Sequence, residues 1–565
     1  MSAAAHPVAA LRDAVERAAT AAAGADAPAP KSRPTLERPR QADHGDYATN
    51  AAMLLAPIMK AKPRDVADRL VVELESGLGA SVDRIEVAGP GFLNLFLSDA
   101  WYVDALGHVL AAGDAFGAGG AERFLKIDVE FVSANPTGPL HVGHARNAAY
   151  GDALSALLSF VGHDVTREYY INDFGSQVVN LGRSVQARAR GEEVPEDGYV
   201  GEYVATLALE IPDAATRPVD QVAADAVAMM IERARESLHA FGVEFDVWFS
   251  EKSLHETQLG HEVSGVQHGF DVLEEQGRSY RSEGALWLRT TDFGDDKDRV
   301  LQRSTGDHTY FASDIAYAQN KRERGFDHMI YVLGADHHGY IGRMKAAYQA
   351  LGGDPDTLDL LIMQFVHLVR GGEKVSMSKR AGEFVTLDDL VEEIGVDAAR
   401  WFLLNRSHDT TIEVDLELAK SESSENPVYY VQYAHARIAS VLRKAGEERV
   451  AEALGMLTAA TSDEGDAHGI SLPALELHPS ERALISKLLA WPQETVEAAD
   501  RRAVHRIATY ALELAQAFTA FYRDCLVVGA EPRELETFRI GLSVAAQRTI
   551  AAALDLLGVS APDEM

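Results

Sequence analysis

Cysteine is nearly absent from the sequence: Cys525 is the only one among 565 residues. A single cysteine excludes a disulfide within the chain and any zinc site built from several cysteines. Cys525 itself is expected to be a small buried side chain and not a nucleophile. Long apolar runs are also missing, and without about 18 consecutive apolar residues no transmembrane helix is expected.

Positive charge is scarce as well. Lys and Arg number 53 against 86 Asp and Glu, which gives a formal net charge of −33. Proteins that bind nucleic acid usually carry a basic surface, so any contact with RNA is expected on limited surfaces only. The acidic excess itself is typical of an adaptation for solubility.

The beginning of the chain lacks the features of a signal peptide. Arg12, Asp13 and Glu16 follow soon after Met1, so there is neither a basic start nor an unbroken apolar stretch. We therefore expect a cytoplasmic protein that does not associate with a membrane.

The first 115 residues predict a small α+β domain. An amphipathic helical pattern near the start gives way to an Ala/Gly/Pro stretch by residue 30, and further helical patterns cover 47–59 and 63–76. Short apolar runs at 85–87 and 92–97 predict two strands. Residues 113–120 are typical of a linker.

Residues 120–405 predict an open parallel sheet. A strand pattern over 124–132 runs into a Pro/Gly-containing loop, a helix over 142–161 and a second strand over 164–170. Strand, loop, helix and strand in this order make a βαβ unit, the start of a Rossmann-like nucleotide-binding fold. Runs at 329–333 and 361–369 predict further strands, and residues 190–260 a mainly helical insertion.

Residues 406–565 predict an all-α bundle, because helical patterns dominate them. The patterns cover 426–445, 479–498, 501–524 and 533–557. The expected fold class is therefore α/β: an open parallel-sheet catalytic domain with an N-terminal α+β domain and a C-terminal all-α helical bundle.

A histidine pair, His141-Val-Gly-His144, lies where the loop after the first predicted strand enters a helix. Unpaired N–H groups and the helix dipole make a helix N-terminus an anion site. Two imidazoles add hydrogen-bond donors for phosphate, and Gly143 lets a flat base approach the backbone. The pattern favours ATP bound for nucleotidyl transfer, although four residues alone also arise by chance.

The second motif is a basic loop, Ser376-Met-Ser-Lys-Arg380, flanked by Gly371, Gly372 and Gly382. A mobile lysine there stabilises negative charge on a leaving pyrophosphate. A solvated charged turn is the alternative. Two such motifs, about 230 residues apart and each after a predicted strand, make a nucleotide site the stronger interpretation.

Together the two motifs resemble the signatures of class I aminoacyl-tRNA synthetases, and the surrounding sequence resembles the arginyl-tRNA synthetase family in particular. The similarity extends over almost the whole chain. The segments that carry it are 44–50 (HGDYATN), 130–140 (EFVSANPTGPL), 172–177 (NDFGSQ), 292–299 (DFGDDKDR), 309–317 (TYFASDIAY) and 426–437 (NPVYYVQYAHAR).

The resemblance implies an arginine–tRNA ligase. Such an enzyme activates arginine with ATP to arginyl-adenylate and transfers it to the 2′-hydroxyl of the terminal adenosine of tRNA-Arg. Residues 1–115 would contact the outer corner of the tRNA, 120–405 would carry out catalysis, and 406–565 would bind the anticodon. The family also implies that tRNA binds before arginine is activated.

By resemblance the ATP site joins both motifs. His141 and His144 would contact the phosphates and Lys379 the departing pyrophosphate, and these three are the expected catalytic residues. Mg²⁺ would bridge the triphosphate oxygens, which leaves few ligands for the protein to supply, and no structural metal is expected. The expected ATP-binding residues are His141, Gly143, His144, Met377, Ser378 and Lys379.

One departure from the family pattern concerns the basic loop. Related loops often have lysine where this chain has Ser376, so Lys379 is expected to carry the phosphate role alone or with Lys374 upstream. The division of labour among Lys374, Lys379 and Arg380 stays open.

An arginine site needs carboxylates, because the guanidinium is a planar cation with five donors. By resemblance Asp314 and Tyr310, four apart on one helix face, would bind the guanidinium. Glu130, at the end of the first strand where ligands bind in open sheets, and Asn135 would bind the α-amino end. The complete expected pocket is Asn94, Glu130, Ser133, Asn135, Tyr310 and Asp314.

Aromatic and basic residues alternate on the helix predicted over 426–445, which resembles a platform for anticodon-loop bases. Either Tyr430 or Tyr433 is expected to belong to the core of the bundle instead. A run of arginines at 501, 502 and 506 predicts a second basic stripe, or only a solvated face. The expected tRNA-binding residues are Tyr429, Tyr433, Arg437 and Arg443, with His435 and Lys444 nearby.

Three alternatives remain at this point. A small-molecule nucleotidyltransferase would share the ATP site but have no use for the helical bundle. A non-catalytic tRNA-binding relative is disfavoured because His141, His144, Lys379 and Asp314 are intact. A class I synthetase for another amino acid, with lysine the nearest competitor, is disfavoured only by the acidic pocket. The protein is expected to be a monomer.

Overall fold

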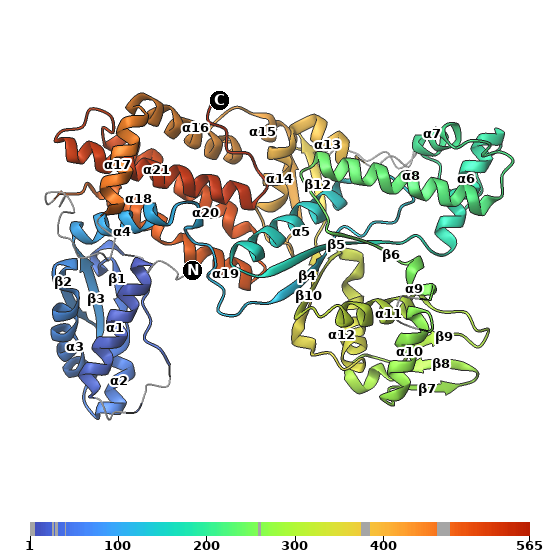
Figure 1. Ribbon diagram of the computed structural model, residues 1–565, viewed down its shortest axis with the longest axis horizontal. Coiled ribbons are helices and arrows are strands. Elements are labelled where there is room, and N and C mark those ends of the chain that lie inside the picture. The colour runs from blue at the N-terminus through green and yellow to red at the C-terminus, as the bar shows by residue number, and fades with distance from the viewer. Residues whose placement is uncertain are drawn as a thin grey trace.

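The computed structural model describes residues 6–24, 28, 32–39, 41–257, 262–374, 385–459 and 475–565. A small N-terminal region, a central parallel sheet with two excursions, and a C-terminal helical bundle follow one another along the chain (Figure 1). None of the helices in these ranges is long and apolar enough to cross a membrane.

The N-terminal region packs helices on an antiparallel sheet of order β1-β3-β2. The helix expected over 47–59 is wrong at its start. Tyr47 and Thr49 are buried and Ala48 is partly exposed, which is the period of a strand, and Ala48 exchanges two backbone hydrogen bonds with Glu37. The elements are α1 (Pro7–Ala23), β1 (Tyr47–Thr49), α2 (Ala51–Met59), α3 (Pro63–Leu78), β2 (Val82–Ala88) and β3 (Phe92–Leu97).

The central sheet is parallel throughout and has the order β11-β10-β4-β5-β6. Alternate residues of β10 face opposite sides: Ile330 and Val332 pack with α5, whereas Met329 and Tyr331 pack with α11 and α12. Helices therefore cover both faces, as a parallel sheet requires. The elements are β4 (Lys126–Glu130), α5 (Val142–Phe160), β5 (Asp164–Ile171), β6 (Val247–Ser250), α11 (Tyr310–Glu323), β10 (His328–Gly334), α12 (Ile341–Ala350) and β11 (Leu358–Met363).

The strand expected over 361–369 is in fact two strands in two sheets. At Gln364 the carbonyl accepts from Arg146 and the N–H donates to the His408 carbonyl, so neither group is available to continue β11. The chain turns there, and β12 (Val366–Arg370) pairs with β13 (Glu373–Lys374) and β14 (Ile412–Asp415) instead.

Two excursions leave the sheet, where the sequence predicted one. The first is helical and has its own apolar core, but it begins at 176 and ends before β6, not at 190 and 260. The second carries an antiparallel sheet of order β7-β8-β9 that was not predicted. The elements are α6 (Ser176–Arg190), α7 (Glu202–Glu210) and α8 (Val219–Ala240), then α9 (Lys252–His255), α10 (Gly265–Glu275), β7 (Ser279–Ser282), β8 (Ala285–Leu288) and β9 (Arg299–Gln302).

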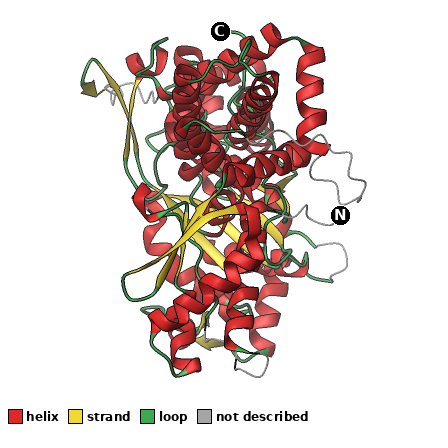
Figure 2. Cartoon of the chain, turned by 90° about the vertical axis from the view of Figure 1, so that its left-hand side faces the viewer, coloured by secondary structure: helices red, strands yellow, loops and turns green. Residues whose placement is uncertain are grey.

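The C-terminal region is nearly all helix, as expected (Figure 2). The helix predicted over 479–498 is divided at Ala490, just before Pro492. Helix α4 (Asp99–Ala112) leaves the N-terminal region and packs against this bundle. The other helices are α13 (Leu387–Ile394), α14 (Val396–Leu404), α15 (Leu416–Lys420), α16 (Pro427–Ala445), α17 (Glu447–Ala459), α18 (Pro479–Leu489), α19 (Trp491–Asp500), α20 (His505–Asp524) and α21 (Arg533–Leu556).

Candidate active site

The histidine pair caps the first turn of α5. His141 is the N-cap residue, and its Nδ1 accepts a hydrogen bond from the Gly143 N–H at 3.0 Å. In return His144 Nδ1 accepts from the His141 N–H at 3.2 Å, and the two rings stack with centroids 3.7 Å apart. A Cβ on Gly143 would lie 2.8 Å from His141 Cε1, so glycine is needed for this packing.

Both imidazoles are neutral near pH 7. Burial lowers the pKa of His144 to about 3, and burial also lowers the pKa of His141. Because a backbone N–H can only donate, each Nδ1 must be an acceptor and each Nε2 must carry the ring proton. The pair therefore presents neutral Nε2–H donors at a helix N-terminus, an arrangement that suits a phosphate group.

The start of α5 is hydrogen-bonded to the chain that follows the second motif. The Val142 N–H donates to the Val385 carbonyl at 3.2 Å, and the Leu387 N–H donates to the Leu140 carbonyl at 2.8 Å. The basic loop itself, with Met377, Ser378 and Lys379, lies outside the described residues, as do Ser376 and Arg380. The fold thus brings the histidine pair next to the residues that immediately follow this loop.

The carboxyl end of β4 makes a strained turn. Val132 and Ser133 both have positive φ, 66° and 41°, which is unusual for residues other than glycine. Asn147 of α5 holds the turn, since its Oδ1 accepts from the Val132 N–H at 2.7 Å and its Nδ2 donates to the Val332 carbonyl at 3.0 Å. Strain of about 1–3 kcal/mol per residue is typical of functional sites.

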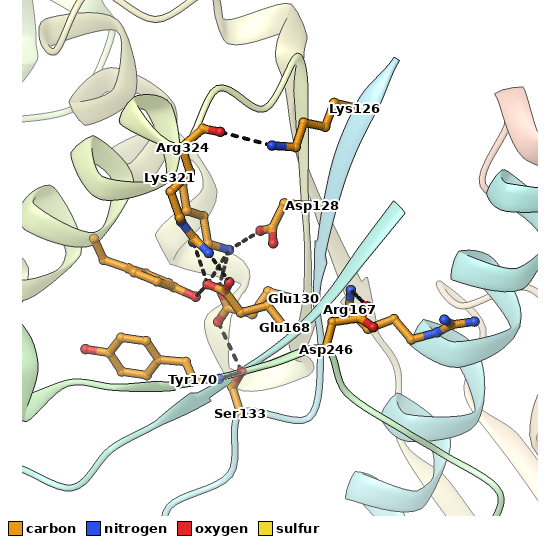
Figure 3. Close-up of polar contacts among 11 residues, drawn as sticks. Lys126, Asp128, Glu130, Ser133, Arg167, Glu168, Tyr170, Asp246, Lys321 and Arg324 are labelled. Carbon is orange, nitrogen blue, oxygen red and sulfur yellow. Dashed lines mark hydrogen bonds and ion pairs between the residues drawn. The ribbon is translucent and has the colours of Figure 1, made fainter. Parts of the chain in front are cut away.

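Below this turn Glu130 is buried and bonded on both carboxylate oxygens (Figure 3). Ser133 Oγ donates to Oε1 at 3.1 Å and Lys321 Nζ donates to Oε2 at 2.8 Å. Ser133 Oγ in turn accepts from the Tyr170 N–H at 3.1 Å. The strand end thus places a fixed carboxylate beside the turn.

Three carboxylates, Glu130, Glu251 and Asp314, lie within electrostatic reach of one another. Burial, then Glu251 and Glu130, raise the pKa of Asp314 to about 8. The pKa of the half-buried Tyr170 is also raised, first by burial and then by Glu251, Asp314 and Glu130. Tyr340 donates its hydroxyl hydrogen to Asp314 Oδ2. A cation is the ligand that such a pocket favours.

Comparison with known proteins agrees with this geometry. The family described as "tRNA synthetases class I (R), catalytic domain" matches residues 108–195 and 226–440. The "Arginyl tRNA synthetase N terminal domain" matches residues 9–97, and the "DALR anticodon binding domain" matches 431–565. An arginine–tRNA ligase of Bacillus velezensis is 44% identical over 544 residues, 94% of either chain. The chain belongs to the arginyl-tRNA synthetases.

Further relatives agree. An arginine–tRNA ligase of Shouchella clausii is 45% identical over 546 residues, again 94% of each chain. The crystal structure of a putative arginyl-tRNA synthetase from Campylobacter jejuni superposes with a TM-score of 0.73 at 33% identity and covers 83% of this chain and 100% of its own. This arginyl-tRNA synthetase is therefore an ATP-dependent ligase that attaches arginine to tRNA-Arg.

The synthetase brings most of the predicted pocket together. Glu130, Ser133 and Asp314 meet as described, and Tyr310 begins α11 one turn before Asp314 with 74% of its side chain exposed, so it is not packed in the core. Asn135 lies exposed in the loop after β4. Asn94 is not brought to them: it is buried on β3, in the N-terminal region that lies apart from β4 and β10 (Figure 1).

The residues predicted to bind tRNA lie on α16 of the synthetase. The rings of Tyr429 and Tyr433 stack at 6.0 Å, and the Arg437 guanidinium lies 4.6 Å from the Tyr433 ring. Tyr430 is the tyrosine that turns inward, donating to Thr519 Oγ1 at 3.1 Å. Arg443 is exposed near the C-terminus and donates to the Asp563 carbonyl at 3.2 Å.

The second predicted basic stripe of the synthetase is not a stripe. Arg502 points inward to Asp359 of β11 at 3.1 Å, and Arg506 is paired with Glu494 and Glu497. Only Arg501 is strongly exposed, because the turn between α19 and α20 sends the three side chains in different directions. Cys525 is buried, as expected.

Three residues of the synthetase that are candidates for a function were not predicted from the sequence. Glu251 and Lys321 are ordinary charged residues in the sequence, and only the fold buries them beside Glu130 and Asp314. Arg146, two residues after His144, is buried with its guanidinium donating to the carbonyls of Gln364, Ser407 and Thr410. A signal was available for Arg146 alone, since an arginine on the apolar face of a predicted helix needs buried partners.

Proposed function

We propose that arginine binds between the carboxyl end of β4 and the start of α11. The observation that supports this most directly is the convergence of Glu130, Glu251 and Asp314 around Tyr170. The Asp314 carboxylate accepts hydrogen bonds from the guanidinium, with Tyr310 covering it from the rim. Glu130, Ser133 and Asn135 receive the α-amino end beside the strained turn.

We propose that Asn94 completes the pocket only when the N-terminal region is brought closer than it lies here. Its place on β3, apart from the catalytic sheet, is the reason for this condition. Among the six proposed pocket residues it therefore carries the least support.

ATP binds at the N-terminus of α5 in this proposal. His141 and His144 donate from Nε2 to the phosphates, and Gly143 leaves room for the nucleotide. The arginine carboxylate attacks the α-phosphorus, pyrophosphate leaves toward Lys379, and the 2′-hydroxyl of the terminal adenosine then attacks the adenylate. The protein contributes mainly positioning and charge stabilisation. Met377 and Ser378 join Lys379 as the ATP contacts of the second motif.

Magnesium arrives with ATP and is held chiefly by triphosphate oxygens. Across the ranges that the structure describes, no group of three or more His, Cys, Asp or Glu side chains lies close enough to hold a metal ion. The donors present are the neutral Nε2–H groups of His141 and His144, which face phosphate better than metal.

We further propose that residues 1–115, 120–405 and 406–565 are the tRNA-contacting, catalytic and anticodon-binding units. The family matches at 9–97, at 108–195 with 226–440, and at 431–565 support this division. The enzyme works as a cytoplasmic monomer in this proposal.

The experiment that tests the substrate is ATP–pyrophosphate exchange with arginine or lysine, each with and without total tRNA. We expect exchange with arginine, only when tRNA is present, and none with lysine, because the planar guanidinium offers a carboxylate the paired donors that a single ammonium does not. Exchange with lysine, or with arginine in no condition, would require the pocket residues to be reassigned.

The anticodon platform predicts a tRNA defect in Tyr433→Ala. Stacking of one base on an aromatic ring contributes about 1–3 kcal/mol, so the KM for tRNA-Arg is expected to rise about fivefold or more, with the arginine KM unchanged. Tyr430→Phe is the matched control, because that ring faces Thr519 in the bundle and loses only a hydroxyl. An equal tRNA KM in Tyr433→Ala and wild type would remove Tyr433 from the platform.

A further inference from the structure

Lys321 lies at the centre of a buried ionic cluster beneath the proposed arginine pocket (Figure 3). It projects from α11 with no exposed side-chain surface, and its Nζ lies 2.5 Å from Asp128 Oδ2, 2.8 Å from Glu130 Oε2 and 3.8 Å from Glu168 Oε1. Arg324, at the end of the same helix, binds both oxygens of Glu168 at 2.5 and 2.8 Å. Tyr317 and Tyr331 place their rings 4.6 and 4.1 Å from the Lys321 ammonium.

The cluster is one positive charge short. Among the described residues, Lys321 and Arg324 are the cations that form ion pairs with Asp128, Glu130 and Glu168. Neither oxygen of Asp128 makes a hydrogen bond of good geometry among the described residues, although its ion pair with Lys321 is close. Buried carboxylates need compensating charge, since the low-dielectric interior strengthens their repulsion. An additional cation beside this cluster would therefore be bound favourably.

Glu130 belongs both to the ionic cluster and to the proposed arginine pocket. The excess negative charge of the cluster therefore lies next to the pocket. Glu130 Oε2 accepts a hydrogen bond from Lys321, whereas Oε1 accepts one from Ser133, which is part of the strained turn at 132–133. Fixing Oε2 fixes the plane of the whole carboxylate. The remaining acceptor capacity of Oε1 is thereby directed toward the turn and away from the cluster.

We propose that Lys321 is a positioning residue for the α-ammonium group of arginine. It holds the Glu130 carboxylate turned toward Ser133, and the substrate ammonium supplies the positive charge that the cluster lacks. The inference rests on the proposed assignment of Glu130 to the α-amino end of arginine. Lys321 acts through Glu130 and does not touch the substrate.

Titration of the cluster agrees with this role. Burial opposes the charge of Lys321, but Asp128 and Glu130 outweigh it and hold the Lys321 pKa well above its usual value. Burial raises the pKa of Asp128 to about 6 even though Lys321 lowers it. Without Lys321 we expect the pKa of Asp128 to rise further, because Lys321 is the cation that lowers it.

Three variants test the inference. Lys321→Met removes the charge and nearly keeps the volume, and leaves the cluster with three carboxylates and one cation. Lys321→Met combined with Asp128→Asn restores the wild-type excess of one negative charge, but Glu130 still lacks its Oε2 partner. Glu130→Gln tests the proposed pocket independently. Lys126→Met, at the other end of β4, is the matched control, because the Lys126 ammonium donates to the Arg324 carbonyl at 3.1 Å and lies over the Phe326 ring, and makes no ion pair with the three carboxylates among the described residues.

The kinetic readout separates positioning from stability. We expect Lys321→Met to raise the arginine KM about tenfold, the loss of a charged hydrogen bond, with the ATP KM unchanged. The charge-balanced double variant should recover thermal stability but keep the raised arginine KM. Inhibition by desamino-arginine, which lacks the α-amino group, should be equal in wild type and Lys321→Met.

The outcomes distinguish the two proposals. An arginine KM unchanged in Glu130→Gln would overturn the assignment of Glu130 and the inference with it. A raised KM in Glu130→Gln, together with a normal arginine KM in the stable double variant, would overturn the inference alone. Equal weakening of arginine and desamino-arginine by Lys321→Met would also overturn it, because the effect would then not concern the ammonium. Adding Lys321→Met to Glu130→Gln should raise the KM no further.

Discussion

Replacing Asp314 by alanine is expected to lower kcat/KM for arginine about thirtyfold or more. Asp314 is the carboxylate proposed for the guanidinium, and truncating one partner of a buried, hydrogen-bonded charge pair costs about 2–5 kcal/mol. The loss should appear mainly in the arginine KM, with the ATP KM little changed. Steady-state aminoacylation with purified tRNA-Arg measures it.

The pH dependence of arginine binding follows from the raised pKa of Asp314. That pKa is about 8 in the empty pocket, chiefly because of burial and then because of Glu251 and Glu130. Below pH 8 most molecules carry a protonated Asp314 that cannot pair with a guanidinium. The apparent affinity for arginine should therefore fall about tenfold per pH unit from 8 to 6, in proportion to the ionised fraction. Arginine binding at pH 7 should release a proton.

Two further variants serve as controls for the predicted pH dependence. Asp314→Asn is permanently neutral, so its weak arginine binding should not vary with pH over this range. Glu275→Ala, an exposed acidic residue at the end of α10, should behave like wild type. An arginine KM for Asp314→Ala equal to that of wild type would exclude Asp314 from the pocket.

The second large effect is expected at His144. Replacing it by glutamine should lower the rate of arginine activation about 10²–10³-fold, the usual cost of removing one donor aimed at developing charge. The arginine KM should change little, since His144 lies at the phosphate end of the site. ATP–pyrophosphate exchange, with tRNA present, measures the activation step directly.

Glutamine is the informative replacement at this position. His144 occupies N3, the third helical position of α5, and forms a capping box with the N-cap His141 by accepting from its N–H. Glutamine at that position can accept the same hydrogen bond, so α5 keeps its start while the Nε2–H donor is lost. His239→Gln, at the exposed end of α8, controls for the substitution itself. Activation at the wild-type rate in a folded His144→Gln would show that the imidazole does not contact the phosphates.

Local sequence patterns predicted the helices and strands whose conformation is determined by their own residues. The helix after His141 and the strands at 126–130, 164–171 and 328–334 were predicted within a few residues, because short apolar runs bounded by loop residues mark strands that are covered on both faces. The strand at 47–49 was missed because three residues are too few to show a period. The break at Gln364 was missed because Arg146, more than two hundred positions away, takes its carbonyl.

The sequence determined the family, the parallel-sheet core and the identity of the two signature motifs, since residue types at fixed spacing carry that information. Only the tertiary structure decided which charges are buried together. Glu130, Glu251, Asp314 and Lys321 come from separate elements, and nothing in their local sequence distinguishes them from solvated charges. Their pKa shifts, and the uncompensated charge beside Glu130, arise from burial and mutual distance, which exist only once β4, β6 and α11 have been packed together.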